Sequence, residues 1–445
     1  MRFVLAPLVV LLIVVTPLFG TDEVGNSKNP QAVDDVKAGR RTTANAAWWG
    51  FDEEDATEAI QSAINSGAKT VIVPNLGKDW IVRPLRLAGH QELILEKGVV
   101  ITAKRGEYRG KSDSVFVAQD IDNLTIRGEG ATVRMQKEDY IVGLVFKDLG
   151  WNRAFGQYEK SEWRMCLAIR GCNNVQIEGL TLRDSGGDGI YIDGGRRAQA
   201  STGIHLKRVN CDNNYRQGLS VISVDGLLVE DSKFCNTWGT PPSAGIDIEP
   251  DAPTQHLTDI VIRNCAFEDN YGDGIEVHAG RLTRESKPIS IVVENCRITS
   301  RRGAGIRVLK LADDGPKGTI TFSNCTVENT EAYGIKVQDK SADAARITFV
   351  DCRLRNTANN RNYADAWFPI VLLGRERGKV KRFGGIEFTK CFVEDIRDRA
   401  AIALPEVPEV FDLTGQIVVK NPRSAMSTFG EKPRGLALTV KAESK

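Results

Sequence analysis

The sequence predicts an all-β solenoid, in which short strands stack coil upon coil. Six phrases recur along its middle, each a residue followed by Gly, an aliphatic, any residue and another aliphatic. Their glycines are spaced 29, 27, 29, 31 and 29 residues apart and are Gly189, Gly218, Gly245, Gly274, Gly305 and Gly334. Repeats of this length are typical of stacked supersecondary units. Each unit also contains an alternating strand and a short aliphatic strand, with almost no helical pattern, so the predicted fold is a parallel β-helix. The Leu spacing of leucine-rich repeats is absent, and a propeller needs longer units.

The first residues predict secretion. Arg2 precedes an apolar run from Phe3 to about Val15, which is typical of a signal peptide over residues 1–20. Leu18 is bulky for a residue near a cleavage site, so a retained anchor is the alternative. We expect an extended lead-in over 21–49 and a β-helix domain over 50–445, in the extracellular space or periplasm. No later stretch is long and apolar enough to cross a membrane.

A helix is predicted over residues 53–66, where alanines and isoleucines recur at helical spacing before Gly67. This helix would cap the first coil of the solenoid. Strands follow over 70–73, 80–82 and 92–95. The repeat is clearest from about 120 to 340, and the C-terminal coils are irregular. Two insertions, 139–164 and 236–243, interrupt the rhythm; the first contains Tyr140, Trp151, Phe155, Tyr158 and Trp163.

Charge and cysteine usage exclude some classes of protein. The chain has 59 basic and 58 acidic residues, a net charge of +1, so we expect neither nucleic-acid binding nor a membrane-surface role. Five of the nine cysteines recur at matching places, which predicts one interior column of free thiols: Cys265, Cys296, Cys325, Cys352 and Cys391. If any disulfide exists, Cys211 and Cys235 are the expected pair.

Alternation along each Gly-aliphatic strand assigns its faces. In the strand after Gly274, Ile275 and Val277 point inward, whereas Glu276 and His278 point outward. The outward residues form three columns. Two residues after each glycine stand Tyr191, Ser220, Asp247, Glu276, Arg307 and Lys336. Two further on stand Asp193, Ile222, Glu249, His278, Leu309 and Gln338. Directly before the glycines stand Asp188, Gln217, Ala244, Asp273, Ala304 and Tyr333.

The acidic residues of these columns form the candidate site. Parallel strands lie about 4.8 Å apart, so the acids of neighbouring coils should share one patch, with Asp188 and Asp193 two coils away. Crowded carboxylates raise the pKa of some members, and hydrolysis of a glycosidic bond needs one raised and one unraised carboxyl. The leading acid/base candidates are Asp247 and Glu276, supported by Asp188, Glu249, Asp273 and His278. Expected substrate-binding residues, which would stack on sugars or hold an acidic substituent, are Tyr191, Arg216, Gln217, Trp238, Arg281, Arg307 and Lys310.

Simpler interpretations compete with this one. Asp and Asn favour the turns of such a fold, so Asp184, Asp269, Asn213 and Asn270 are expected turn formers. A structural role is also favoured for Asp193 and Asp251 taken singly. Carboxylate clusters bind Ca²⁺ as well, but no metal-loop spacing is present, so no metal ligand is predicted. Zinc spacings, a phosphate loop and a Gly-x-Ser-x-Gly elbow are absent.

The N-terminal coils resemble a known group. Residues 55–64, 70–74, 84–87 and 93–98 resemble the opening of the pectin-lyase-like, right-handed parallel β-helix proteins, and polygalacturonases begin in a similar way. The resemblance runs from about 50 to 400. That superfamily includes hydrolases, lyases, epimerases, tailspikes and adhesins. The polygalacturonase motifs are missing here: there is no Gly-His-Gly, and Asp313-Asp314 lies outside the Gly-Ile strands. The Asp-Pro-His-Asp motif of alginate epimerases is absent, and the stretch from Arg83 to Arg86 lies in the N-terminal coils rather than where a pectate lyase places its arginine. The resemblance implies that a substrate lies along the outward parallel sheet.

Three hypotheses follow for the function. The first is a secreted glycoside hydrolase that acts on a polysaccharide or oligosaccharide. The second is a polysaccharide lyase or epimerase, in which Arg216, Arg281 or Lys310, with His278 or a calcium ion, would neutralise a uronate. The third is a carbohydrate-binding module without catalysis. The sequence does not specify the sugar, the linkage or the oligomeric state.

Overall fold

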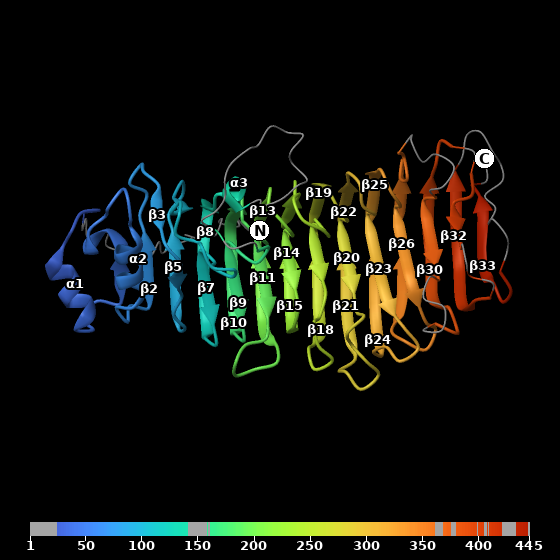
Figure 1. The fold of residues 1–445 in the computed structure, drawn as a ribbon, viewed down its shortest axis with the longest axis horizontal. Helices are drawn as coiled ribbons and strands as arrows, with labels where there is room; N and C mark the ends of the chain where they lie inside the picture. The colour runs from blue at the N-terminus through green and yellow to red at the C-terminus, as the bar shows by residue number, and fades with distance from the viewer. Residues whose placement is uncertain are drawn as a thin grey trace, which may run out of the picture.

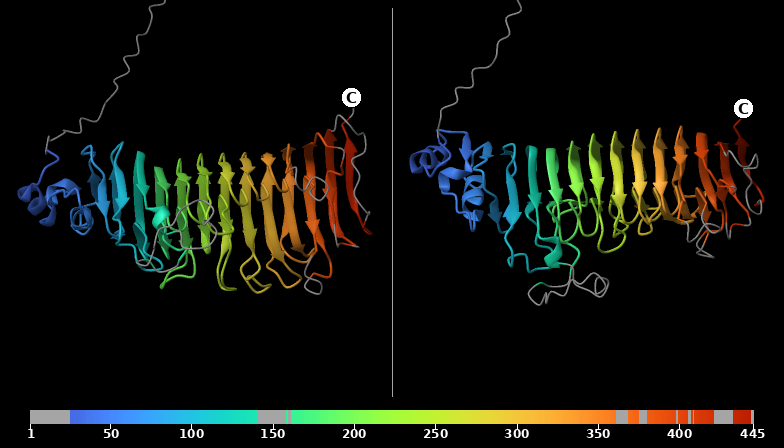
Figure 2. Two further views of the ribbon diagram at one scale, coloured as in Figure 1. Left: turned by 45° about the horizontal axis from the view of Figure 1, so that its top comes forward. Right: turned by 90° about the horizontal axis from the view of Figure 1, so that it is seen from above.

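The chain folds into a straight stack of coils, drawn from α1 at one end to β33 at the other in Figure 1. This computed structural model describes residues 25–140, 158, 161–360, 368–374, 380–397, 399–404, 407, 409–420 and 433–443. All strand pairings between its named strands are parallel, apart from isolated bridges, and the same coil recurs along the whole stack (Figure 2). The predicted right-handed parallel β-helix is confirmed.

Two sheets build the described part of the stack. The small sheet has 11 strands: β4 (Leu85–Arg86), β7 (Phe116–Gln119), β9 (Leu167–Arg170), β11 (Ile190–Asp193), β14 (Leu219–Val221), β17 (Ile246–Ile248), β20 (Ile275–His278), β23 (Ile306–Leu311), β26 (Ile335–Lys340), β29 (Ile370–Leu373) and β31 (Ile402–Ala403). The repeat glycines directly precede β11 to β26, so the repeated phrases form this sheet.

The large sheet has 22 strands and covers the other faces of each coil. They are β1 (Thr43–Asn45), β2 (Thr70–Val73), β3 (Trp80–Val82), β5 (Gln91–Leu95), β6 (Val100–Ala103), β8 (Asp122–Arg134), β10 (Asn173–Arg183), β12 (Ser201–Lys207), β13 (Asn210–Asp212), β15 (Val224–Glu230), β16 (Lys233–Cys235), β18 (Leu257–Arg263), β19 (Ala266–Asn270), β21 (Ile289–Glu294), β22 (Arg297–Ser300), β24 (Gly318–Ser323), β25 (Thr326–Thr330), β27 (Arg346–Val350), β28 (Arg353–Arg355), β30 (Gly384–Glu394), β32 (Phe411–Lys420) and β33 (Ala437–Ala442). Most coils therefore contribute three strands, as the repeat predicts.

The repeat glycines allow the coils to approach closely. A Cβ atom added at Gly245 would lie 2.7 Å from the Gly274 carbonyl oxygen and 2.8 Å from Nδ2 of Asn270. At that distance something must shift, so a larger residue would push neighbouring coils apart. The glycine fixes the start of each small-sheet strand and therefore its register.

Stacked side chains fill the interior of the coils. Phe349 stacks on Phe322 and Phe388, with ring centroids 5.2 and 5.0 Å apart. The five cysteines of the predicted column are buried and free, and so are the other four. Cys211 and Cys235 form no disulfide: Cys211 is paired with Phe234 across β13 and β16, whereas Cys235 is paired with Asp212. Alternate residues of a strand point to opposite faces, so the two thiols do not face one another.

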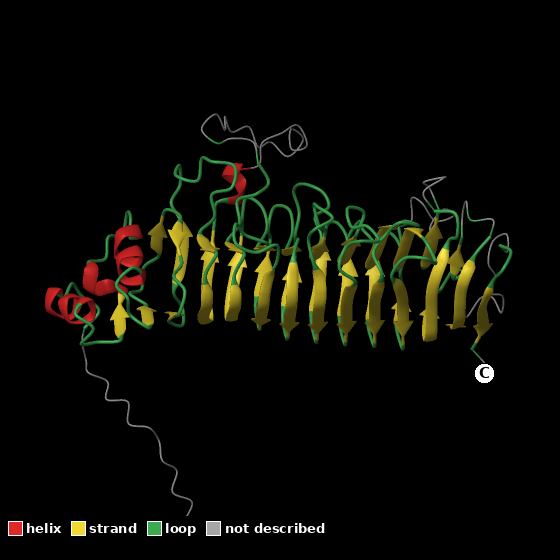
Figure 3. Ribbon diagram, turned by 90° about the horizontal axis from the view of Figure 1, so that it is seen from below, coloured by secondary structure: helices red, strands yellow, loops and turns green. Residues whose placement is uncertain are grey.

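Helices cover the N-terminal end of the stack (Figure 3). The predicted capping helix is present as α2 (Thr57–Ile64), shorter than residues 53–66 because its N-cap is Ala56 and its C-cap Asn65. The expected extended lead-in instead contains α1 (Pro30–Lys37) and a 3₁₀ turn, Ala46–Trp49. Asn29 caps α1 by accepting the Ala32 N–H, and Pro30 occupies its first turn.

Two sequence predictions fall on segments that lie outside the described residues. They are the signal peptide and, within the first insertion, Trp151 and Phe155. The short helix α3 (Lys137–Tyr140) precedes this gap. Within the described part of the chain, no helix has the length and hydrophobicity needed to cross a membrane.

The expected turn formers divide into two kinds. Asp184, Asn213 and Asp269 have positive φ angles of 54–55°, a conformation that Asn and Asp tolerate better than most residues. Asn270 instead points into the coil, where its Nδ2 donates to the Phe234 carbonyl and its Oδ1 accepts the Thr237 N–H. Its side chain therefore joins its own coil to the preceding one.

Candidate active site

The register of the small sheet confirms the first predicted column. Ser220 is paired with Asp247, Asp247 with Glu276, and Glu276 with Arg307. His278, in the next column, is on β20 beside Glu276. The acids from three coils therefore lie on one outward face, as the spacing predicts.

These outward acids are nearly covered. Asp188 is 0%, Asp247 1%, Asp273 4% and Glu276 6% exposed. In contrast, the side chains of Glu249 and His278 are 32% and 22% exposed. The cluster therefore has a buried part, formed by the four covered acids, and an accessible edge, formed by Glu249 and His278. A ligand would contact this edge first.

Arg216 is the cation of one half of the cluster. It interacts electrostatically with Asp188, Asp247 and Glu249, and these carboxylates keep its pKa raised against the opposing effect of burial. Its Nε lies 3.7 Å from Oε1 of Glu162, whose Oε2 accepts a hydrogen bond from Thr240. Glu162 is a component that the sequence analysis missed. It lies near the end of the first insertion, 139–164, where no periodic pattern indicates its position in the fold.

Arg307 is the cation of the other half. Its Nη1 lies 3.1 Å from Oδ2 of Asp273 and 3.5 Å from Oε2 of Glu276. The other oxygen of Asp273 accepts the backbone N–H of Ala304. Six clustered acids, Glu162 included, thus face two guanidinium groups, so the arginines cannot neutralise every carboxylate in the ionised state.

The carboxyl groups respond with opposite pKa shifts. Burial raises the pKa of Asp188 to about 7, and burial together with the neighbouring Asp273 raises that of Glu276 to about 9. Burial and the charge of Glu249 hold the pKa of Asp247 well above its usual range. The contact with His278, whose Nδ1 lies 2.9 Å from Oε1, lowers the pKa of Glu249. At neutral pH, Glu276 is protonated and Glu249 is ionised, and the raised pKa of Asp247 favours its neutral form.

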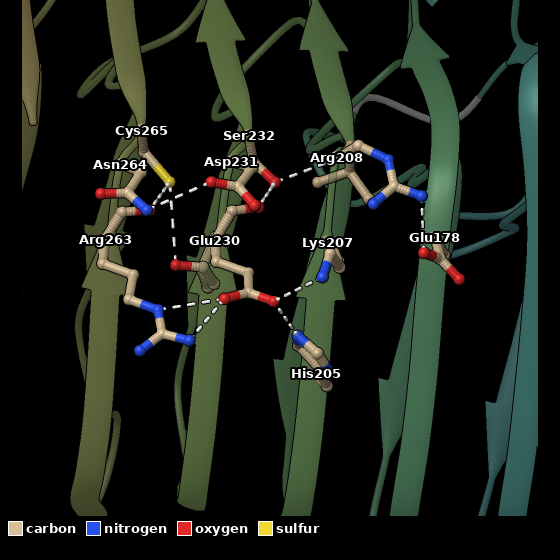
Figure 4. Close-up of polar contacts among 12 residues, drawn as sticks. Glu178, His205, Lys207, Arg208, Glu230, Asp231, Ser232, Arg263, Asn264 and Cys265 are labelled. Carbon is tan, nitrogen blue, oxygen red and sulfur yellow. Dashed lines mark hydrogen bonds and ion pairs between the residues drawn. The ribbon is translucent and has the colours of Figure 1, made fainter. Parts of the chain in front are cut away.

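The large sheet provides an internal comparison. Glu230 on β15 is also buried, but Arg263, Lys207 and His205 surround its carboxylate (Figure 4). Two hydrogen bonds from Arg263, at 2.6 and 3.0 Å, lead the effects that lower the pKa of Glu230 to about 2. A buried glutamate with a structural ion-pair role therefore has a lowered pKa in this protein, whereas the pKa of Glu276 is raised. Such raised values concentrate at functional sites.

The predicted substrate-binding residues lie in different settings. Arg216 and Arg307 belong to the cluster. Gln217 is fully buried, with both ends of its amide bonded within the protein. Arg281 is exposed on the loop after β20. Lys310, on β23, lies 3.5 Å from Oδ2 of Asp339.

The two predicted aromatic contacts are both held by neighbouring side chains. Tyr191 is half-buried, its hydroxyl donates to Asp193, and Arg170 lies 5.1 Å above its ring. Trp238 donates its indole N–H to Asn213 and packs against the ammonium group of Lys137, 4.1 Å from the ring centroid. Tyr191 is paired directly with Ser220, so it borders the cluster.

Asp193 has contacts typical of a structural residue. Its Oδ1 accepts the Gly194 N–H at 2.7 Å and Nε2 of Gln255 at 3.1 Å, so it joins two loops. Asp251 is exposed at the start of the second loop. Among the described residues, no three His, Cys, Asp or Glu side chains are arranged to hold a metal ion.

Known proteins match this chain in sequence and in structure. Residues 159–309 and 289–366 match the family model described as the right handed beta helix region. A SPbeta prophage-derived uncharacterized protein of Bacillus subtilis (strain 168) is 22% identical over 278 residues, covering 59% of this chain and 45% of that protein. A probable polygalacturonase of Arabidopsis thaliana is 22% identical over 284 residues, covering 62% of this chain and 54% of that protein. The chain thus spans about half the length of these curated relatives.

Among solved structures, the A-module of the Azotobacter vinelandii mannuronan C-5 epimerase AlgE6 superposes with a TM-score of 0.62 at 12% identity, covering 90% of this chain and 100% of that module. At this identity the likeness concerns the fold. The chain therefore has the right-handed parallel β-helix fold, and these matches support the resemblance to the pectin-lyase-like group that the N-terminal coils show.

Proposed function

We propose that the protein is a polysaccharide-active enzyme that hydrolyses glycosidic bonds at the acidic cluster of the small sheet. The proposal rests on two carboxyl groups of neighbouring coils whose pKa values are shifted in opposite directions. Glu276 is protonated at neutral pH and Glu249 is ionised. Groups whose pKa values are pushed apart in this way are suited to act as acid and base.

The two groups are on neighbouring strands at a useful separation. Glu249 follows β17, two residues beyond Asp247, the direct partner of Glu276. A strand spacing of about 4.8 Å and a two-residue step of about 6.6 Å give a diagonal of about 8 Å between their Cα atoms. Inverting hydrolases hold the carboxyl groups themselves about 6.5–9.5 Å apart, which leaves room for a water molecule. Backbones at this Cα spacing allow the two side chains to reach such a separation.

In the proposed reaction Glu276 protonates the leaving glycosidic oxygen. Glu249 removes a proton from a water molecule, whose oxygen attacks the anomeric carbon from the opposite face. Asp247, one of the two leading candidates from the sequence, is 1% exposed and is two residues before Glu249 on the same face of the coil. Arg307 holds Glu276 and Asp273 in place, and is partly exposed toward a ligand.

A second candidate is elimination or epimerisation of a uronate. The observation that favours it is the pair Arg216 and Arg307, which place positive charge beside a base. A cation near the uronate carboxyl assists removal of the adjacent proton. Likeness to an epimerase fold is compatible with this reaction but does not specify it.

One screen separates these reactions. The purified protein is incubated with a panel of neutral and uronate-containing polysaccharides, and new reducing ends are measured together with ultraviolet absorbance. Hydrolysis yields reducing ends without absorbance, whereas elimination yields an unsaturated, absorbing product. Binding without either product would favour a carbohydrate-binding module. We further propose that the chain is exported, because residues 1–20 match a signal peptide.

A further inference from the structure

Gln217 contacts the cluster from the turn before β14. Its Oε1 accepts the Ala244 N–H at 2.8 Å, and its Nε2 donates to Oδ2 of Asp247 at 3.0 Å. A backbone N–H can only donate, so the amide oxygen must face Ala244. The amide nitrogen must therefore face Asp247, and this orientation has no equivalent flipped form.

The same pair of contacts recurs two coils further along, with an acceptor in place of the donor. Asp273 occupies the column position of Gln217, and its Oδ1 accepts the Ala304 N–H just as Gln217 accepts that of Ala244. The second oxygen of Asp273, Oδ2, accepts a hydrogen bond from Arg307, whereas the amide nitrogen of Gln217 donates one to Asp247. The scaffold thus accepts either a carboxylate or an amide at this position, and Gln217 places a donor against the Asp247 carboxyl of the next coil.

This donor restricts where Asp247 can hold a proton. An oxygen that accepts an N–H is poorly placed to carry a proton directed at that same donor. Oδ1 is buried and, among the described residues, has no hydrogen-bond partner. Glu249 is two residues beyond Asp247 and its N–H continues the strand pairing, so the two side chains lie on the same face of the coil.

We propose that Gln217 is a positioning residue that keeps the proton of Asp247 on Oδ1, directed at Glu249. The inference rests on the proposed function, in which Glu249 is the base. A proton fixed on Oδ1 holds the Glu249 carboxylate in one orientation without neutralising it. The charged and titratable groups facing this pair are Asp188, Arg216, Asp273, Glu276, His278 and Arg307.

Infrared spectroscopy of the full chain tests this directly. A neutral carboxyl gives a C=O band, and the band lost in Asp247→Asn identifies Asp247. In Gln217→Leu, Oδ2 loses its donor, so we expect the Asp247 band to move to higher wavenumber. Gln217→Glu retains the acceptor for Ala244, as Asp273 does, and serves if the leucine variant does not fold. It replaces the donor with an acceptor, so the proton moves to Oδ2 and the band moves as well.

Kinetics on a glycan that the wild type cleaves provide the second measurement. We expect kcat to fall about tenfold to a hundredfold in both variants, as for a misplaced catalytic group, with KM unchanged because Gln217 is fully buried. A band that stays in place in a folded variant, or a wild-type kcat in Gln217→Glu, would overturn the inference. If the wild type cleaves no glycan, the proposed function fails, whereas the band still decides the position of the proton.

Discussion

Glu276→Gln should stabilise the protein while removing its activity. In the folded state Glu276 is protonated at pH 7, because its pKa is about 9, whereas in the unfolded chain it ionises near 4.5. Keeping the group neutral at pH 7 therefore costs about 2.5 pH units, or about 3 kcal/mol at 1.36 kcal/mol per unit. An amide has no such cost. For a chain of 445 residues, 1 kcal/mol corresponds to about 1 °C in Tm, so we expect a rise of about 2–3 °C.

The pH dependence of this gain has a defined sign. The folded-state pKa is raised, so the wild type has its full stability below about pH 4.5 and loses it as pH rises toward 9. The advantage of Glu276→Gln should therefore be absent at pH 4 and grow with pH. Thermal melts followed by circular dichroism at pH 4, 5.5 and 7 measure it.

Glu230→Gln is the matched control, because it changes a buried glutamate of the other sheet. Its pKa is lowered, so its charge stabilises the fold above about pH 4.5, and that benefit is lost as pH falls toward 2. Its cationic partners are 33–42% exposed, so we expect a loss of about 1 kcal/mol at pH 7 with activity retained. A Tm of Glu276→Gln that is unchanged or lower at pH 7, or an advantage equally large at pH 4, would refute the reasoning.

Three further predictions follow from the described residues. Gly245→Ala should cost about 1–3 kcal/mol in chemical denaturation, because its Cβ would lie 2.7 Å from the Gly274 carbonyl oxygen; wild-type stability would contradict the close approach. All nine cysteines should resist a thiol reagent in the native protein and react after unfolding, since all are buried; rapid labelling of the native chain would contradict this. The kcat/KM of hydrolysis should fall as pH rises through about 9, where Glu276 loses its proton, and Glu276→Gln should remove this limb together with the activity; a profile still rising at pH 10 would exclude Glu276 as the acid.

The repeat explains why so much of the fold could be predicted. Because each repeat glycine directly precedes a small-sheet strand and β17 pairs with β20 without a register shift, counting two residues from Gly245 and Gly274 places Asp247 opposite Glu276. The same counting brings Glu249 beside His278, and the structure places them 2.9 Å apart. The columns of a solenoid can be predicted from sequence because the distance between successive repeat glycines determines which residues are paired in neighbouring coils.

Features outside the repeat could not be derived in this way. Glu162 reaches Arg216 from an insertion that has no periodicity, so no count predicts the contact. Counting also assigns Asp247 and Glu276 to the outward face, but not their burial, which depends on how neighbouring side chains such as Gln217 and Arg307 cover them. Gln217 was expected to bind substrate because it occupies an outward column; its reach into the next coil is a matter of three-dimensional packing.

The most direct test of the account measures reducing ends released from a responsive polysaccharide by the wild type, Asp247→Asn and Glu276→Gln, with circular dichroism to establish that all three are folded. The account predicts hydrolysis by the wild type and its loss in both folded variants. Full activity in both amide variants would show that the acidic cluster of the small sheet is not the site of catalysis.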